Sequence, residues 1–460
     1  MQKLTIIFFV KFHLFCGLLL YSLGLPKTAS SGEAPYNVSW IKQIGTNADD
    51  YSYGVSFDRL GFTYITGRTH GDLAEVNSGD SDIFLSKYDE MGNLQWSRQF
   101  GTTQLDEGHS ISTDGIGNIF ISGITGGTLH GANFGFRDAF LTKYDAAGNL
   151  TWTRQIGTEK YDDSTSVSAD GLGNVYVSGT TLGSLAGPIG GITDAFICKY
   201  DISGNLAWAR QVGTTSNEHS WGVSADGVGN VYLTGFTDGA FGGPFSGARD
   251  AFITKFSSDG NLIWKRQIGT ADYDDSYSVK ADGMGSVFVS GRTRGSLDGG
   301  NSGDFDAFLS KFDQDGNLLW SRQLGSSQYD SSNGVTVDVL GNVYISGITE
   351  GLVGDHNFGA ADVFILKYDP IGNLIWKHQL GTREADDSWG VSADLSGNVY
   401  ISGYTAGSLD GLNLGRSDAY IAKLSPQIPE PSTFLLLGSI ALPILVYLII
   451  SKIIVATRRI

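Results

Sequence analysis

A period of 56 residues runs through most of the chain and constrains its fold more than any other feature. Seven tryptophans follow it: Trp40, Trp96, Trp152, Trp208, Trp264, Trp320 and Trp376. An aspartate recurs with the same period from Asp82 to Asp418, and a lysine follows each of these aspartates. No insertion or deletion interrupts the spacing. An unbroken tandem repeat of this kind predicts one large repeat domain rather than several independent domains.

The composition indicates that each repeat folds as β-structure. Gly accounts for 64 of the 460 residues and Pro for only 9, while aromatic and β-branched residues are abundant between the glycines. Such sequences form short strands joined by tight turns. A disordered Gly-rich chain would lack the aromatic residues needed to bury a core, so the composition favours ordered all-β structure.

The third repeat shows the strand pattern most clearly. Its apolar runs predict four strands, at residues 166–170, 174–179, 194–200 and 205–213. The turns at 170–174 and 201–205 have the form Asp-x-x-Gly-Asn, and their glycines supply the positive φ angles that short hairpins need. A four-stranded unit repeated seven times predicts a seven-bladed β-propeller over residues 37–424.

The two ends of the repeat region indicate that the ring is closed. The chain enters the region with a fourth-strand pattern at residues 38–43 and leaves it after a third strand at 418–424. Pairing these ends completes one blade and removes two exposed sheet edges. The alternative fold is an open β-solenoid, which has no reason to divide one repeat between the chain ends.

Segments outside the repeats predict export and anchoring. Residues 1–30 combine basic residues, an apolar run and small residues, as a secretory signal peptide does. Residues 434–450 carry no charge and are just long enough to cross a bilayer as a transmembrane helix. The basic tail at 451–460 predicts a cytoplasmic end, with the propeller outside.

The linker at 425–433 and the chain end carry a more specific pattern. Pro429, Glu430 and Pro431 precede the apolar segment, and Arg458 and Arg459 close the chain. This arrangement resembles the PEP-CTERM sorting signal of Gram-negative bacteria. The resemblance implies processing by an exosortase-type enzyme and delivery to the cell surface or extracellular matrix. An ordinary membrane anchor with a chance Pro-Glu-Pro linker is the alternative.

The repeats themselves resemble the SBBP family of bacterial β-propeller repeats. The resemblance rests on segments such as Gly-Asn-Val-Tyr-Val-Ser-Gly at 173–179 and Gly-Asn-Val-Tyr-Ile-Ser-Gly at 397–403. It covers roughly residues 40–424 and implies a fold and a surface setting. No catalytic residues come with it, and fold-level likeness does not supply a function.

Charge and cysteine content exclude several classes of function. The formal charge is −17, and without the terminal basic segments it approaches about −23. Nucleic acid is therefore not an expected partner, whereas divalent cations and neutral sugars are compatible with this charge. Cys198 would be the one cysteine left after removal of the leader, so no intramolecular disulfide is expected.

One acidic position recurs in all seven repeats just before the first predicted strand. It is occupied by Asp50, Asp106, Asp162, Glu218, Asp274, Asp330 and Asp386. If the first strand is innermost, these carboxylates circle one mouth of the central channel. Clustered carboxylates suit a hard cation such as Ca²⁺, but each acid could equally cap backbone amides in its own loop.

Three residues after each acid lies a position that varies. It holds Tyr53, His109, Thr165, Trp221, Tyr277, Asn333 and Trp389. Aromatic residues at a channel mouth combine apolar area with polar edges, so Tyr53, His109, Trp221, Tyr277 and Trp389 are candidate ligand-binding residues for a polysaccharide or a surface protein. Packing between blades is the alternative role.

These features predict a non-enzymatic binding or adhesion scaffold. The seven histidines share no motif spacing, and no nucleophile triad or metalloprotease signature is present. Two alternatives stand beside it. One is a carbohydrate-active enzyme that uses carboxylates at the channel mouth, and the other is a calcium-binding structural module.

Overall fold

The computed structural model describes residues 36–427, which form 28 strands and no helix. The first blade holds β2 (Asp50–Phe57), β3 (Thr63–Thr69), β4 (Asp82–Tyr88) and β5 (Leu94–Phe100). The second holds β6 (Asp106–Thr113), β7 (Ile119–Thr125), β8 (Asp138–Tyr144) and β9 (Leu150–Ile156). The third holds β10 (Asp162–Ala169), β11 (Asn174–Thr181), β12 (Asp194–Asp201) and β13 (Leu206–Val212). The fourth holds β14 (Glu218–Ala225), β15 (Val231–Thr237), β16 (Asp250–Phe256) and β17 (Leu262–Ile268). The fifth holds β18 (Asp274–Ala281), β19 (Ser286–Thr293), β20 (Asp306–Asp313) and β21 (Leu318–Leu324). The sixth holds β22 (Asp330–Val337), β23 (Val343–Thr349), β24 (Asp362–Tyr368) and β25 (Leu374–Leu380). The seventh holds β26 (Asp386–Ala393), β27 (Val399–Thr405), β28 (Asp418–Pro426) and β1 (Tyr36–Ile44).

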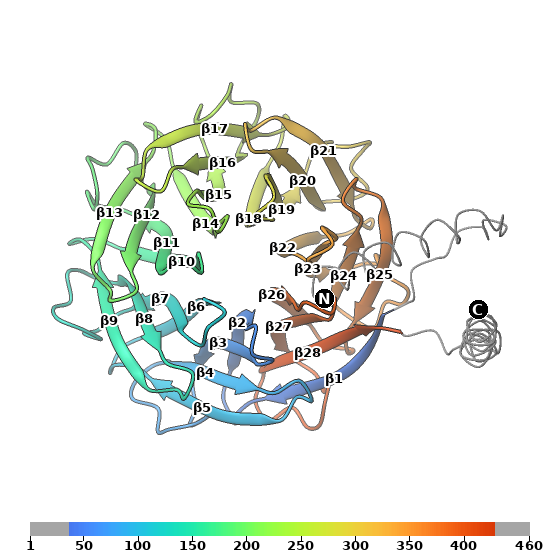
Figure 1. Cartoon of the computed structure of the whole chain (residues 1–460). Helices are drawn as coiled ribbons and strands as arrows, with labels where there is room; N and C mark the ends of the chain where they lie inside the picture. Colours follow the sequence, from blue (N-terminus) through green and yellow to red (C-terminus); the bar gives the residue numbers. More distant parts are fainter. Residues whose placement is uncertain (1–35, 428–460) are drawn as a thin grey trace, which may run out of the picture. The chain divides into compact units, whose positions relative to one another are not determined.

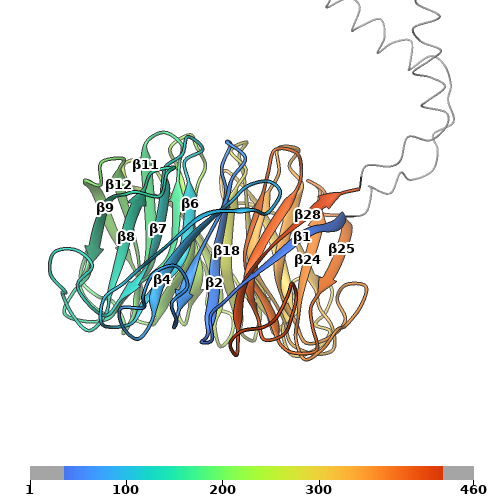
Figure 2. The same cartoon turned by 90° about the horizontal axis from the view of Figure 1, so that it is seen from below.

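The seven sheets stand around a central channel, as Figure 1 shows. Within a blade consecutive strands pair antiparallel, and the first strand of each repeat lies innermost. Strand β1 pairs with β28, from Tyr36 opposite Pro426 to Ile44 opposite Ala419. The side view in Figure 2 shows β1 and β28 together at the rim of the disc. The predicted seven-bladed propeller, closed by its N-terminal strand, is confirmed.

The innermost strands begin earlier than the sequence predicts. In the third repeat the strand starts at Asp162 rather than at residue 166. The reason is that residues 162–164 still pair with residues 179–181 of β11 beyond a shift in register at Thr165. The N–H of Asp162 also donates to the carbonyl oxygen of Arg137 at 2.9 Å. The recurring acid is therefore the first residue of the strand and not part of the preceding loop.

Apolar residues pack between the faces of neighbouring blades. In one such cluster Tyr64 and Leu85 of the first blade meet Ile111 and Ile121 of the second. These four side chains are all buried. Because each blade buries both faces in this way, the strands carry nearly continuous apolar runs where they lie in the middle of a sheet.

A recurring set of hydrogen bonds connects the rim of each blade to the next. Trp208 Nε1 and Lys199 Nζ both donate to the carbonyl oxygen of Ser258, at 2.9 and 3.0 Å. Arg210 Nε donates to the carbonyl oxygen of Gly260 at 2.8 Å. The acceptors lie in the turn between β16 and β17. The repeating tryptophan, lysine and arginine of one blade thus hold the outer turn of its neighbour.

A second recurring contact explains a glycine that follows every fourth strand. Gln99 Nε2 donates to Oδ2 of Asp82 at 3.1 Å, across β5 and β4. The other carboxylate oxygen of Asp82 lies against Gly101, where an added Cβ atom would come within 2.2 Å of it. Any larger residue at this position would displace the buried carboxylate.

The predictions for the chain ends lie outside the described residues. These are the signal peptide at 1–30, the sorting motif at 429–431, the transmembrane helix at 434–450 and the basic tail. Among residues 36–427, no helix has the length and apolar character needed to cross a membrane.

Candidate functional site: the axial pocket

A pocket of about 410 Å³ lies on the axis of the ring. All seven innermost strands contribute to its wall, and every one of the seven variable positions is part of the lining. The pocket therefore brings together residues that are far apart in sequence. It contains the five residues predicted to bind a ligand, namely Tyr53, His109, Trp221, Tyr277 and Trp389.

A β-bulge in each innermost strand presents the variable residue. In β2 the pairing with β3 shifts register between Ser52 and Gly54, so that Tyr53 has no direct partner. The same shift occurs at the equivalent position of the other six innermost strands. Bulges re-aim a side chain and often border functional sites. The variable residue is therefore the one that the backbone turns out of the regular pairing.

Aromatic rings form two groups in the pocket wall. Tyr53 lies between Trp389 and His109 and makes edge-to-face contacts with both, at centroid distances of 6.0 and 5.6 Å. Trp221 and Tyr277 form a second edge-to-face pair at 5.8 Å. Trp389 is 39% exposed. These contacts hold the rings while leaving apolar surface open to the channel.

An ion-paired carboxylate lies beside the first aromatic group. Glu107 Oε2 lies 2.9 Å from Nε2 of His109, and Arg68 donates to the other carboxylate oxygen. Burial alone would raise the pKa of Glu107, but the hydrogen bonds and positive charges of these two partners lower it to about 2. His109 Nδ1 faces the carbonyl oxygen of Ser164 at 2.9 Å. Both ring nitrogens of His109 thus face an oxygen atom.

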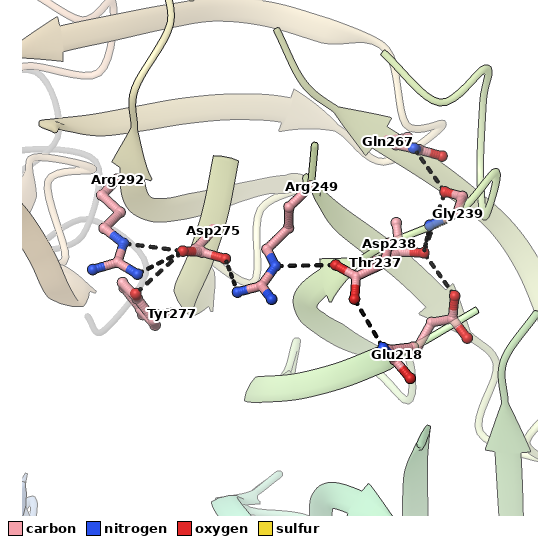
Figure 3. A network of polar contacts seen from close by, with 10 residues as sticks. Glu218, Thr237, Asp238, Gly239, Arg249, Gln267, Asp275, Tyr277 and Arg292 are labelled. Carbon is pink, nitrogen blue, oxygen red and sulfur yellow. Dashed lines mark hydrogen bonds and ion pairs between the residues drawn. The ribbon is translucent and has the colours of Figure 1, made fainter. Parts of the chain in front are cut away.

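A second charged network supports Tyr277, as Figure 3 shows. Asp275 accepts hydrogen bonds from Arg292, with Nε at 3.0 Å and Nη2 at 2.9 Å, and Arg249 reaches its other oxygen at 3.4 Å. Nε of Arg249 also forms an ion pair with Oδ1 of Asp238 at 3.1 Å. The hydroxyl of Tyr277 lies 3.5 Å from Asp275. The network joins blades four and five behind the pocket wall and compensates the charge of the buried Asp275.

Among residues 36–427, Asp387 has no basic partner. Its carboxylate is buried and accepts a hydrogen bond from Asn333 Nδ2 at 3.1 Å. Burial raises the pKa of Asp387 to about 7, against the smaller opposing effect of hydrogen bonds from Ser388, Asn333 and Trp389. Asn333 and Trp389 both line the pocket. A group that changes charge near neutral pH is therefore connected to two pocket residues.

Sequence reasoning did not assign roles to Glu107, Asp275 and Asp387 individually. They occupy one repeat position, two residues before the bulge, whose seven occupants are Tyr51, Glu107, Asp163, His219, Asp275, Ser331 and Asp387. The signal that could have identified them was this variation, which matches that of the bulged position.

The seven recurring acids lie within the blades rather than in the pocket wall. Oδ2 of Asp162 accepts hydrogen bonds from the backbone N–H and the hydroxyl of Thr158, at 2.6 and 2.8 Å. Asp50, Asp274 and Asp386 contact a threonine four residues earlier in the same way. All seven acids are fully buried. This geometry matches loop capping, and calcium binding by these residues stays a prediction.

No cation site is evident elsewhere in the described part. Within residues 36–427 the structure contains no group of three or more His, Cys, Asp or Glu side chains placed to hold one metal ion. Cys198 is buried, and burial raises the pKa of its thiol to about 12.

A closed ring of seven four-stranded antiparallel sheets around an axial pocket defines the protein as a seven-bladed β-propeller. Residues 39–74, 95–129, 151–186, 319–351 and 375–410 match the model of the SBBP beta-propeller repeat. These five segments of the propeller therefore carry SBBP beta-propeller repeats.

Two curated relatives are longer than this chain. The regulatory protein FlaEY of Caulobacter vibrioides is 26% identical over an alignment 284 residues long, which covers 53% of this chain and 30% of that protein. An uncharacterized WD repeat-containing protein of Acanthamoeba polyphaga mimivirus is 20% identical over 430 residues, covering 68% of this chain and 31% of the relative. This chain thus spans about a third of the length of these relatives.

Among solved structures, the WD40 beta propeller domain of Doa1 aligns with a TM-score of 0.51 and 12% identity. The alignment covers 85% of this chain and 97% of that domain. At this identity the likeness supports the fold alone.

Proposed function

We propose that the protein is a non-enzymatic scaffold of the cell surface or extracellular matrix, and that its axial pocket binds saccharide units of a polysaccharide. The observation that carries the proposal is the set of seven bulges. Seven similar repeats contribute five different residue types at this position to one pocket. A purely structural position would not need to vary in this way between blades.

The chemistry of the pocket suits a sugar. Open rings such as those of Trp389 and Trp221 offer apolar faces for the C–H side of a pyranose. Asn333, Thr165 and His109 supply polar groups around the same pocket. Ligand sites commonly combine an aromatic wall with a few convergent polar groups in this way.

The enzymatic alternative has less support from the pocket. Glycoside hydrolysis uses two carboxyl groups on either side of the scissile bond. Among the described residues that line the pocket, Glu107 is the only acid. Its two oxygens are both engaged, by His109 and by Arg68. A second carboxyl group would have to reach the ligand from behind the pocket wall.

Export and sorting are part of the same proposal. They depend on the leader, on Pro429, Glu430 and Pro431, and on the basic tail with Arg458 and Arg459. Intact-mass analysis of the protein recovered from the cell envelope tests this part. Loss of both terminal segments is expected, and recovery of the complete 460-residue chain from the cytoplasm would contradict it.

Binding is tested by calorimetric titration of the full chain with cellohexaose, mannohexaose and hexagalacturonate. The variants are Trp389→Asn and Trp221→Thr. Asn and Thr already occur at this position in other blades, so the fold should be preserved. We expect the dissociation constant for a bound sugar to rise at least about tenfold. The control is Leu340→Ser, which changes an exposed turn residue to the Ser found at the matching position of the last repeat. Equal binding by all variants would refute the pocket as the site.

A further inference from the structure

A second ring of side chains lies deeper in the channel, toward the end of the innermost strands. It occupies one repeat position, whose seven occupants are Ser56, Ser112, Ser168, Ser224, Lys280, Thr336 and Ser392. Five blades have serine here and one has threonine. The fifth blade alone departs from hydroxyl chemistry and supplies a lysine.

The serine hydroxyls of this ring connect neighbouring blades. The N–H of Ala169 donates to Oγ of Ser112 at 3.0 Å, and the N–H of Ala225 donates to Oγ of Ser168 at 3.1 Å. The N–H of Phe57 likewise donates to Oγ of Ser392 at 3.2 Å. Each of these oxygens therefore accepts from the next blade, and its own O–H remains to donate. These three serines therefore keep a hydroxyl donor, whereas the hydroxyl of Ser224 donates to the carbonyl oxygen of Ala225 and that of Ser56 contacts Thr113 Oγ1.

Lys280 has no hydrogen-bond or ion-pair partner in the described structure, and its side chain is exposed. The repeating lysines at the rim behave differently. Lys199 and Lys255 each donate to a carbonyl oxygen of the next blade, both at 3.0 Å. The surrounding blades desolvate the ammonium group and so lower the pKa of Lys280 although solvent reaches the side chain, and no acidic group offsets this effect. Its ammonium group is therefore an uncompensated donor.

The stem of Lys280 leads into the channel. Ser278 lies two residues earlier on the same side of β18 and lines the axial pocket. The serines equivalent to Lys280 reach the inner edge of the next blade, as the Ala225 contact with Ser168 shows. Along the strand the step from Ser278 to Lys280 is roughly 7 Å. Lys280 therefore lies beyond Ser278 of the pocket wall by about the length of one sugar residue.

We propose that Lys280 and the surrounding hydroxyls bind a carboxylate or sulfate group in the channel, and that the polysaccharide held by the aromatic pocket is therefore an acidic one. The sugar part of this inference rests on the proposed function, whereas the anion site rests only on the ring. Charge-assisted hydrogen bonds to an anion from an ammonium group and several hydroxyls are stronger than neutral ones. They would also discriminate against a neutral sugar of the same shape.

The test compares hexagalacturonate with its methyl ester, which keeps the rings and removes the charge. The variant is Lys280→Ser, which installs the residue of five other blades and offers an acceptor for the next blade. We expect the wild-type chain to bind the acid about tenfold or more tightly than the ester. In Lys280→Ser this preference should disappear while binding of the ester is unchanged. Equal affinity of the wild-type chain for acid and ester would overturn the acidic ligand.

A second measurement separates the anion site from the sugar site. Sodium sulfate is titrated into both proteins at constant ionic strength and the melting temperature is followed, because a ligand of the folded state raises it. A saturable rise in the wild-type chain that is absent in Lys280→Ser supports the anion site even if no hexasaccharide binds, and in that case only the proposed sugar ligand fails. The same response in both proteins would overturn the anion site.

Discussion

The ring of Trp389 stands edge-on to the ring of Tyr53, with 6.0 Å between their centroids and an angle of 87° between their planes. The two residues belong to the last and the first blade. They meet because β1 completes the seventh sheet and closes the ring. One of the two aromatic groups of the pocket thus spans the junction at which the chain ends are paired.

Loss of Tyr36 should weaken this closure. The side chain is buried, packs on Trp376 at a centroid distance of 4.8 Å, and hydrogen-bonds Tyr344 at 2.9 Å and the carbonyl oxygen of Gly397 at 3.0 Å. We expect Tyr36→Ala to lower the free energy of unfolding by about 3 kcal/mol or more, measured by urea denaturation.

Tyr36→Phe is the matched variant for this prediction. It keeps the ring and removes the hydroxyl, so we expect a smaller loss of about 1 to 2 kcal/mol. If Tyr36→Ala and Tyr36→Phe were both as stable as the wild-type chain, pairing of β1 with β28 would not limit the stability of the ring.

The repeat period made the fold predictable, but it could not reveal the bulges. The constant spacing of the tryptophans and the repeat divided between the chain ends were enough to predict seven blades and their closure. By contrast, Ser52, Tyr53 and Gly54 form an ordinary strand sequence. Their shift in register arises from pairing with Thr66 and Gly67 of β3, which no local pattern encodes.

The candidate site was predictable where residues differ between repeats and not where partners come from other strands. Trp221 and Trp389 stood out because they do not follow the tryptophan period. The role of Glu107 could not be predicted in this way, because its partner Arg68 lies on β3 of the preceding blade. Lys280 was visible in the sequence as the one residue without a hydroxyl at its repeat position, but only the geometry of the inner strands shows where it lies.

Gly101→Ala should destabilise the fold although it adds one methyl group. Its Cβ would lie 2.2 Å from Oδ1 of Asp82, a buried carboxylate that Gln99 also holds. We expect a loss of about 1 to 3 kcal/mol in the free energy of unfolding. Gly187→Ala is the control, because the nearest atom to its added Cβ is 3.8 Å away and its φ is not positive. Similar stabilities for the two variants would show that the carboxylate moves aside without cost.

Calcium should have little effect on the melting temperature. Oδ2 of Asp274 already accepts hydrogen bonds from the N–H and the hydroxyl of Thr270, at 2.6 and 2.9 Å. A cation would have to compete with these donors at a fully buried carboxylate. We expect no saturable shift up to millimolar Ca²⁺ by differential scanning calorimetry. A saturable rise that Asp274→Asn abolishes would instead establish the acidic ring as a cation site.

Stability should increase as the pH falls from 7.5 toward 5. Burial raises the pKa of Asp50, Asp106, Asp274, Asp330 and Asp386, with Asp274 reaching about 6. Their ordinary value in an unfolded chain is about 3.9. Between these limits the folded state binds more protons than the unfolded state, so the stabilisation is complete at low pH and is lost as the pH rises through the folded pKa values.

Protonation of Glu107 lowers the stability of the fold, and it does so at lower pH than the protonation of the buried aspartates. Its pKa of about 2 means that the stability contributed by its contacts with His109 and Arg68 is lost as the pH falls below about 4.5. Thermal unfolding across pH 3 to 8 should therefore show a maximum of the melting temperature near pH 5.

Asp274→Asn removes one titrating group and should flatten the decline of the melting temperature between pH 5 and 7.5. The reason is that a shift of about two pKa units corresponds to about 2 to 3 kcal/mol. A melting temperature that rises steadily from pH 5 to 7.5 would mean that these buried carboxylates are ionised at less cost than their surroundings imply.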